Sequence, residues 1–117
     1  MDDETCDLLC LDLPKAEALR AALPEPQELR AAAELAKAAG DPTRLAVLLA
    51  LRGEQCCVCD LAWVIGRPEK LVSHHLRLLK AAGAVRSRRE GRMVVYELTA
   101  TGAALVAAVE QTREALR

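Results

Sequence analysis

The sequence predicts a mainly α-helical domain with one small β-hairpin, and three observations support this fold class. Hydrophobic residues make up 52% of the 117 residues but aromatic residues only 2%, and an alanine-rich composition of this kind favours closely packed helices. Apolar residues recur at helical spacing in segments that glycine or proline bounds. Only residues 85–98 resemble a pair of strands.

Two helices are expected before residue 40. Pro14 can open a short helix that extends to about residue 23, where two closely spaced prolines end it. A second helix runs through residues 29–39, whose apolar positions follow helical spacing, and Gly40 supplies its stop.

The third expected helix should be the buried centre of the domain. Asp41 is a suitable N-cap, and Pro42 fits the first helical position. Residues 45–51 are apolar on nearly every side, and the helix should end at Gly53.

A short helix over residues 60–65, closed by Gly66, leads into a longer helix over residues 68–82. The longer helix has an apolar stripe, widened at its edges, that consists of Val72, Leu76 and Leu79 with Leu71, His75 and Leu78. We expect His75 to pack or form a hydrogen bond. The opposite, basic arc carries Lys70, Ser73, His74, Arg77 and Lys80. Two helices joined by a brief glycine-containing turn form a helix-turn-helix, whose second helix lies in the DNA major groove.

A hairpin follows this helix pair and completes a winged helix-turn-helix. Residues 85–89 and 93–98 are the expected strands, joined at Glu90-Gly91. The tip bears three cations, Arg88, Arg89 and Arg92. Such a tip can contact phosphates or insert an arginine into the minor groove. A final helix is expected over residues 99–117, with small residues that would let a second copy approach.

Charge divides the chain into two parts. Residues 1–25 carry two basic and seven acidic side chains, a net −5, whereas residues 67–92 carry eight basic and two acidic ones, a net +6. We therefore expect an acidic N-terminal segment over residues 1–25, and a DNA-binding and dimerisation domain over residues 26–117. The N-terminal arm, residues 1–13, is expected to be mobile without metal.

Five cysteines occur in two groups. Cys57 and Cys59 lie one residue apart, while Cys6 and Cys10 lie on the arm. Four thiolates can complete a tetrahedral site for a soft metal ion. We infer that Cys57 and Cys59 lie at a helix start, where the helix dipole would lower the thiol pKa. Cys56 is interpreted as a packing residue.

Other function classes remain possible. The dithiol Cys57 and Cys59 could sense oxidants or persulfide without metal, in which case the arm cysteines would be dispensable. An enzyme is not expected, because a cysteine nucleophile needs a positioned base and the two histidines lie on the DNA-reading helix. A metal buffer would leave the basic block unexplained. The acidic start lacks the regions of a signal peptide, and the odd cysteine count argues against a disulfide framework, so a cytoplasmic protein with reduced thiols is expected.

The chain resembles the ArsR/SmtB family of winged-helix metal-sensing repressors over about residues 26–117. The matching motifs are Asp41-Pro42-Thr43-Arg44, Cys57-Val58-Cys59-Asp60-Leu61-Ala62, Val72-Ser73-His74-His75-Leu76-Arg77-Leu78-Leu79 and Arg89-Glu90-Gly91-Arg92. With Cys6 and Cys10, it is most similar to the cadmium- and lead-responsive branch.

This resemblance implies a homodimer that binds a palindromic operator when metal-free and is released by cadmium, lead, bismuth or zinc. It also implies that the arm cysteines of one subunit join the paired cysteines of the other. Two departures argue against other branches of the family. Arsenite sensors have a third cysteine where this chain has Ala62, and zinc sensors with a site on the C-terminal helix use a histidine, yet none follows His75.

Overall fold

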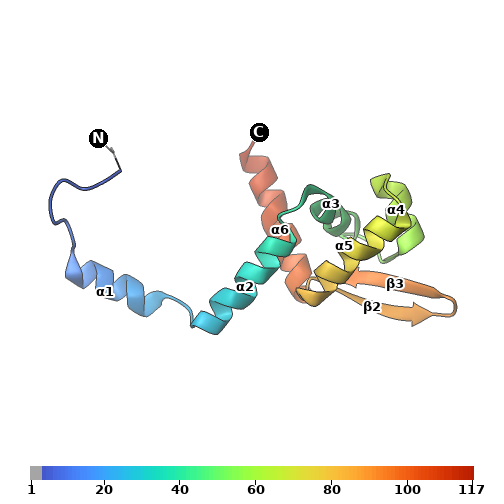
Figure 1. Cartoon of the computed structure of the whole chain (residues 1–117), viewed down its shortest axis with the longest axis horizontal. Helices are drawn as coiled ribbons and strands as arrows, with labels where there is room; N and C mark the ends of the chain where they lie inside the picture. Colours follow the sequence, from blue (N-terminus) through green and yellow to red (C-terminus); the bar gives the residue numbers. More distant parts are fainter. Residues whose placement is uncertain (1–3) are drawn as a thin grey trace.

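The computed structural model describes residues 4–117 and confirms a mainly helical winged helix-turn-helix (Figure 1). Its elements in order are α1 Leu13–Ala22, α2 Pro26–Ala38, α3 Pro42–Ala50, β1 Cys56–Cys57, α4 Val58–Ile65, α5 Glu69–Ala81, β2 Val85–Glu90, β3 Met93–Leu98 and α6 Ala100–Ala115. Among the described residues, no helix has the length and apolar character needed to cross a membrane.

The core forms around α3, as the apolar pattern predicts. Val47 and Leu48 are fully buried, and the Asp41 carboxylate caps the helix by accepting a hydrogen bond from the Arg44 backbone N–H at 3.0 Å. Residues of α4, α5 and α6 complete the same cluster. Burial of these aliphatic side chains is the main force that holds the helix-turn-helix together.

The recognition helix α5 buries a narrower stripe than its sequence predicts. Val72, His75, Leu76 and Leu79 are buried, but the two flanking leucines, at positions 71 and 78, are 39% and 40% exposed. In one chain the flanking leucines lie at the edges of the contact between α5 and the core, where neighbouring elements cover them only in part.

The wing contains one strand more than predicted. β2 and β3 pair antiparallel and turn at positions 91 and 92, one residue later than expected, with Gly91 at a φ of +60° that suits a type II′ turn. The additional strand is β1, which pairs with β3 through Cys56 opposite Tyr96 and Cys57 opposite Val95. A strand of two residues is too short to show a period-two pattern.

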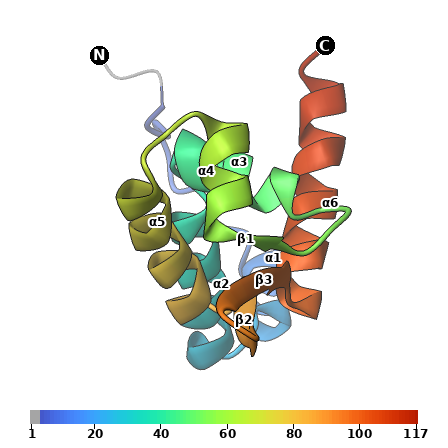
Figure 2. The same ribbon diagram turned by 90° about the vertical axis from the view of Figure 1, so that its right-hand side faces the viewer.

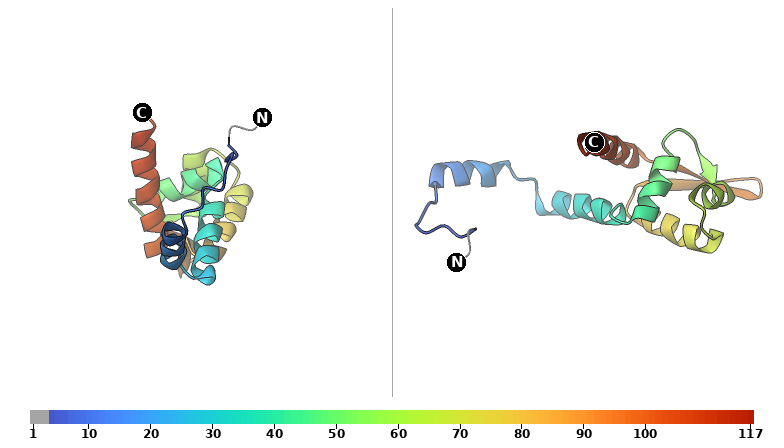
Figure 3. Two further views of the ribbon diagram at one scale, coloured as in Figure 1. Left: turned by 90° about the vertical axis from the view of Figure 1, so that its left-hand side faces the viewer. Right: turned by 90° about the horizontal axis from the view of Figure 1, so that it is seen from above.

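The helices α1 and α2 extend away from this body (Figures 1 and 3). The described chain measures 65 × 31 × 24 Å, with a radius of gyration of 19.3 Å, whereas a compact chain of this length has about 13 Å. Within the described chain neither helix has a buried residue, and leucines such as Leu19 and Leu29 are exposed. Exposed leucines on two helices without a buried residue indicate a surface that contacts another molecule.

The start of α6 packs so closely on the backbone that only glycine fits there. A Cβ added at Gly102 would lie 2.0 Å from the carbonyl oxygen of Ala84. We predict that Gly102→Ala lowers the free energy of unfolding by about 3 kcal/mol, because backbone must move to relieve the overlap. The midpoint of urea unfolding at fixed protein concentration measures this. Gly53→Ala is the control, since a Cβ at Gly53 meets nothing within 4 Å; equal stability of the two variants would contradict the packing.

Candidate metal centre and nucleic-acid interface

Cys57 lies at the junction of β1, β3 and α4. It is the last residue of β1, pairs with Val95 of β3 and is the N-cap of α4. Its backbone N–H donates a hydrogen bond to the Asp60 carboxylate at 3.4 Å. Figure 2 shows β1 between α4 and β3. The prediction that the paired cysteines lie at a helix start is confirmed, although α4 begins two residues earlier than expected.

Cys59 lies in the first turn of α4 and faces the recognition helix. Its thiol is exposed and donates a hydrogen bond to Glu69 Oε1 at 3.4 Å, and Glu69 is the first residue of α5. This hydrogen bond and the negative charge of the Glu69 carboxylate raise the pKa of the Cys59 thiol, with slight burial and the Cys57 thiol adding to the effect. The expected lowering of thiol pKa by the helix start is therefore wrong for Cys59, because a carboxylate beside it opposes the thiolate.

Cys56 has a different environment. It is half-buried, packs against the hydrophobic core, and donates a hydrogen bond to the Glu54 carbonyl at 3.6 Å. Burial raises the pKa of the Cys56 thiol, and the nearby Asp60 and Glu54 charges raise it further. These contacts support the packing role that its position suggests.

The arm cysteines are paired with each other. Cys6 and Cys10 are exposed and their sulfur atoms are 3.0 Å apart, a contact that raises the pKa of Cys6. The described part of the arm lies at the opposite end of the chain from α4 (Figure 1). Residues 4–117 of a single chain therefore bring together no group of three or more potential metal ligands.

The arm thiol pair nevertheless fits a soft ion. Two sulfur ligands of one tetrahedral zinc ion lie about 3.8 Å apart, given metal–sulfur bonds of about 2.3 Å. The 3.0 Å contact between Cys6 and Cys10 would need only a small opening to reach that separation. Cys6, Cys10 and Cys59 are exposed and Cys57 is half-buried, so a soft metal could draw ligands from both groups if the two groups met.

The DNA-reading face predicted on α5 is solvent-facing. Lys70, His74 and Arg77 are exposed and line a shallow groove with Pro68 and Leu71, while Ser73 is half-buried on the same helix. The groove combines the cations Lys70 and Arg77 with His74, side chains that can contact phosphates and base edges.

The wing presents fewer free cations than its sequence suggests. Arg89 and Arg92 are exposed, as expected. In contrast, Arg88 turns back to contact Gln55, Glu90 and Glu97, the last at 3.3 Å. Lys80 of α5 donates a hydrogen bond to Ser87 Oγ of β2 at 2.7 Å. These two cations fix the wing against the rest of the domain.

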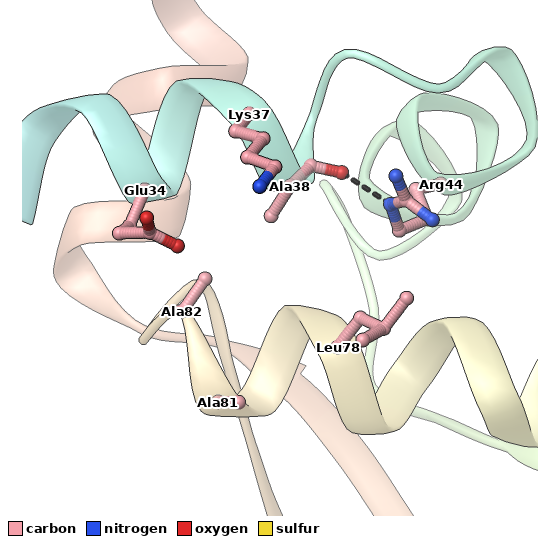
Figure 4. Close-up of a pocket in the computed structure, with 7 residues that line it drawn as sticks. All are labelled: Glu34, Lys37, Ala38, Arg44, Leu78, Ala81 and Ala82. Carbon is pink, nitrogen blue, oxygen red and sulfur yellow. Dashed lines mark hydrogen bonds between the residues drawn. The ribbon is translucent and has the colours of Figure 1, made fainter.

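Arg44 connects two helices through contacts that the sequence did not predict. Its Nε donates to the Ala38 carbonyl at the end of α2, and Nη1 lies 3.3 Å from His75 Nδ1 on α5. Because arginine can only donate, Nδ1 of His75 is the acceptor, and burial lowers the pKa of His75. Figure 4 shows Arg44 beside a pocket of about 290 Å³ between α2 and α5.

Comparison with known proteins gives a consistent family. Residues 41–87 match the family model described as bacterial regulatory protein, arsR family. The HTH-type transcriptional repressor SmtB of Mycobacterium tuberculosis (strain H37Rv) is 49% identical over 76 residues, which cover 64% of this chain and 56% of that repressor. The chain thus spans little more than half of that relative's length.

Two further matches cover more of the chain. The cadmium resistance transcriptional regulatory protein CadC of Listeria innocua is 32% identical over 97 residues, covering 82% of this chain and 81% of that protein. The solution structure of a homodimeric winged helix-turn-helix DNA-binding domain from Mycobacterium bovis, a possible ArsR-family regulator, superposes with a TM-score of 0.68 at 26% identity, covering 92% of this chain and 91% of that domain.

The contact between Cys59 and Glu69 yields a prediction about thiol chemistry. Glu69→Gln removes a negative charge but keeps an acceptor oxygen, so the pKa of Cys59 should fall and its reaction with iodoacetamide near neutral pH should become faster. The rate is measured against pH in a chain whose other four cysteines are serine. Glu54→Gln is the matched control, because Glu54 acts on Cys56 and not on Cys59. An unchanged pH profile for Glu69→Gln would show that the carboxylate does not act on this thiol.

Proposed function

The chain belongs to the ArsR family of bacterial regulatory proteins, and we propose that it is a transcriptional repressor that a soft, thiophilic metal ion releases from its operator. The observation that carries this proposal is the position of Cys57 and Cys59. One thiol is at the junction of the wing and α4, and the other contacts the first residue of the recognition helix. A ligand bound there acts directly on both DNA-contacting elements.

The proposed assembly is a homodimer in which each metal site is shared between subunits. The arm that carries Cys6 and Cys10 lies at the opposite end of its own chain from α4 (Figure 1). A four-thiolate site is therefore reached more readily through a second copy. The exposed leucines of α1 and α2 supply apolar surface for such a dimer. The homodimeric domain from M. bovis has the same fold.

The ligand set proposed here is Cys57 and Cys59 of one subunit with Cys6 and Cys10 of the other. Sulfur donors favour soft ions, so cadmium, lead and bismuth, with zinc as a competitor, are the candidate inducers. The relative from L. innocua is named as a cadmium resistance regulator. Glu110 on α6 is held by ion pairs with Arg52 and Arg113, both 2.8 Å, which leaves little support for a site on that helix.

The proposed DNA target is a palindrome read by two copies of α5. Two recognition helices must fit successive major grooves about 34 Å apart. Lys70, Ser73, His74 and Arg77 of each subunit would face the groove, and Arg89 and Arg92 would contact the flanking backbone. Metal needs only to favour a dimer arrangement in which the two recognition helices have a spacing that does not fit the major grooves. By linkage, DNA must then weaken metal binding by the same factor by which metal weakens DNA binding.

The α4 cysteines test this function directly. Cys57→Ser with Cys59→Ser should abolish release of the operator by cadmium, because no thiolate then connects the ion to α4, whereas DNA affinity without metal should be unchanged. Fluorescence anisotropy of labelled operator during a cadmium titration measures both. Cys56→Ser is the control and should retain release. Release that persists in the double variant would refute the site.

Sequence reading by α5 and phosphate contact by the wing can be separated. Ser73→Ala should reduce the preference for operator over scrambled duplex by about 1 kcal/mol. Arg92→Ala should weaken both duplexes alike and reduce the slope of log affinity against log salt by about 1 per subunit. Binding isotherms at several salt concentrations provide these values. Arg113→Ala, on α6, is the control cation. Equal binding of wild type to both duplexes would contradict specific recognition.

A further inference from the structure

We propose that Trp63 and Val64 of α4 form a docking surface for the leucines of the arm of a second copy, Leu8, Leu9 and Leu11, in the metal-bound dimer. This inference rests on the proposed function and adds an apolar contact to it. The thiolates would hold the ion, while the leucines and the tryptophan would determine how firmly the arm is held on α4.

The two apolar groups are exposed in the single chain. Trp63 is 85% exposed and Val64 is 58% exposed, although α4 otherwise contributes Leu61 and Ala62 to the core. On the arm, Leu8, Leu9 and Leu11 are 72%, 91% and 64% exposed. Neither side chain belongs to the hydrophobic core of the described chain, so both leave apolar surface available for a contact with another molecule.

Both groups are adjacent to the thiols that would share the ion. Trp63 follows Cys59 by four residues on α4, so the two side chains are neighbours along one face of the helix. Leu8 and Leu9 lie between Cys6 and Cys10 in the sequence. An ion shared by the two thiol pairs therefore brings the arm leucines beside Trp63.

The surface is too small to bind a free protein. A tryptophan buries at most about 250 Å², whereas a stable protein–protein interface buries about 1,200 Å² or more. A segment already tethered by the shared ion has a high effective concentration and needs little area. The chain's own arm lies at the other end of the molecule (Figure 1), so the occupant is the arm of a second copy.

Charge favours the same occupant. The arm carries Asp7 and Asp12 close to its leucines. Arg67 is exposed in the turn that follows α4, four residues after Trp63, and Lys70 is exposed in the first turn of α5. An acidic apolar segment thus matches an apolar surface with cations beside it.

Trp63 is the single tryptophan of the sequence, so its emission reports on this surface alone. In the full-length wild type, cadmium should shift the emission to shorter wavelength and lower the acrylamide quenching constant by about half, as expected for a ring that becomes partly buried. The sulfur-to-cadmium charge-transfer absorption, measured in the same titration, reports on metal binding independently.

The triple serine variant, Leu8→Ser with Leu9→Ser and Leu11→Ser, should keep the charge-transfer band and lose the protection of Trp63. Its cadmium affinity should be about tenfold weaker, because the apolar contact no longer holds the tethered arm. Leu116→Ser, which changes a leucine that is 81% exposed at the end of α6, is the matched control and should behave as wild type.

Three results would overturn the docking surface. The first is a Trp63 that remains fully quenchable in wild type saturated with cadmium, and the second is a Trp63 that remains protected in the triple serine variant. The third is protection of Trp63 when metal-free protein binds operator, which would make the surface a DNA contact. In each case an intact charge-transfer band and operator release would leave the proposed function standing. Absence of the band in wild type would instead reject the proposed function and the docking surface together.

Discussion

The pairing of Cys57 with Val95 is the interaction on which the rest of the site depends. Through this pairing β1 joins β3 of the wing, and the same cysteine then caps α4. Two residues further, Cys59 contacts Glu69, where the recognition helix begins. The wing, the first helix of the helix-turn-helix and the recognition helix therefore meet at three consecutive residues. A metal ion bound by these thiols would act on the wing and the recognition helix directly, because both DNA-contacting elements are neighbours of the residues that bind it.

This arrangement would also set a cost for the proposed metal binding. The Glu69 carboxylate raises the pKa of Cys59, so an ion bound there would have to displace a proton from a thiol that is already hydrogen-bonded. Displacement removes the hydrogen bond and leaves a thiolate beside a carboxylate at the start of α5, which favours a change in their relative position. On the other side of the domain, Arg44 connects the end of α2 with His75 of α5. A shift of the recognition helix would therefore change the contacts of Arg44 with α2, which carries part of the apolar surface proposed for the dimer.

Much of the fold could be predicted from sequence, because its signals are local. The cap formed by Asp41 and Pro42, the stripe on α5 and the hairpin strands all appear within about one residue of their expected places. Three features could not be predicted. β1 is too short to show periodicity, and the contacts of Glu69 with Cys59 and of Arg44 with His75 join residues far apart in sequence. The expected low thiol pKa at the helix start was wrong for Cys59 because that prediction considered the helix dipole without the carboxylate. The joining of the arm cysteines with those of α4 remains a prediction.

A mixed dimer tests the central claim, that each ion is held between subunits, most directly. One chain carries Cys6→Ser and Cys10→Ser, and a second, differently tagged chain carries Cys57→Ser and Cys59→Ser. Neither homodimer has both thiol pairs, but the heterodimer has one complete set across its interface and none within either chain. Cadmium coordination is measured by X-ray absorption on the purified heterodimer. The prediction is one site per heterodimer with four sulfur ligands around the cadmium ion. A cadmium ion in the heterodimer with the same number of sulfur ligands as in either homodimer would contradict a shared site.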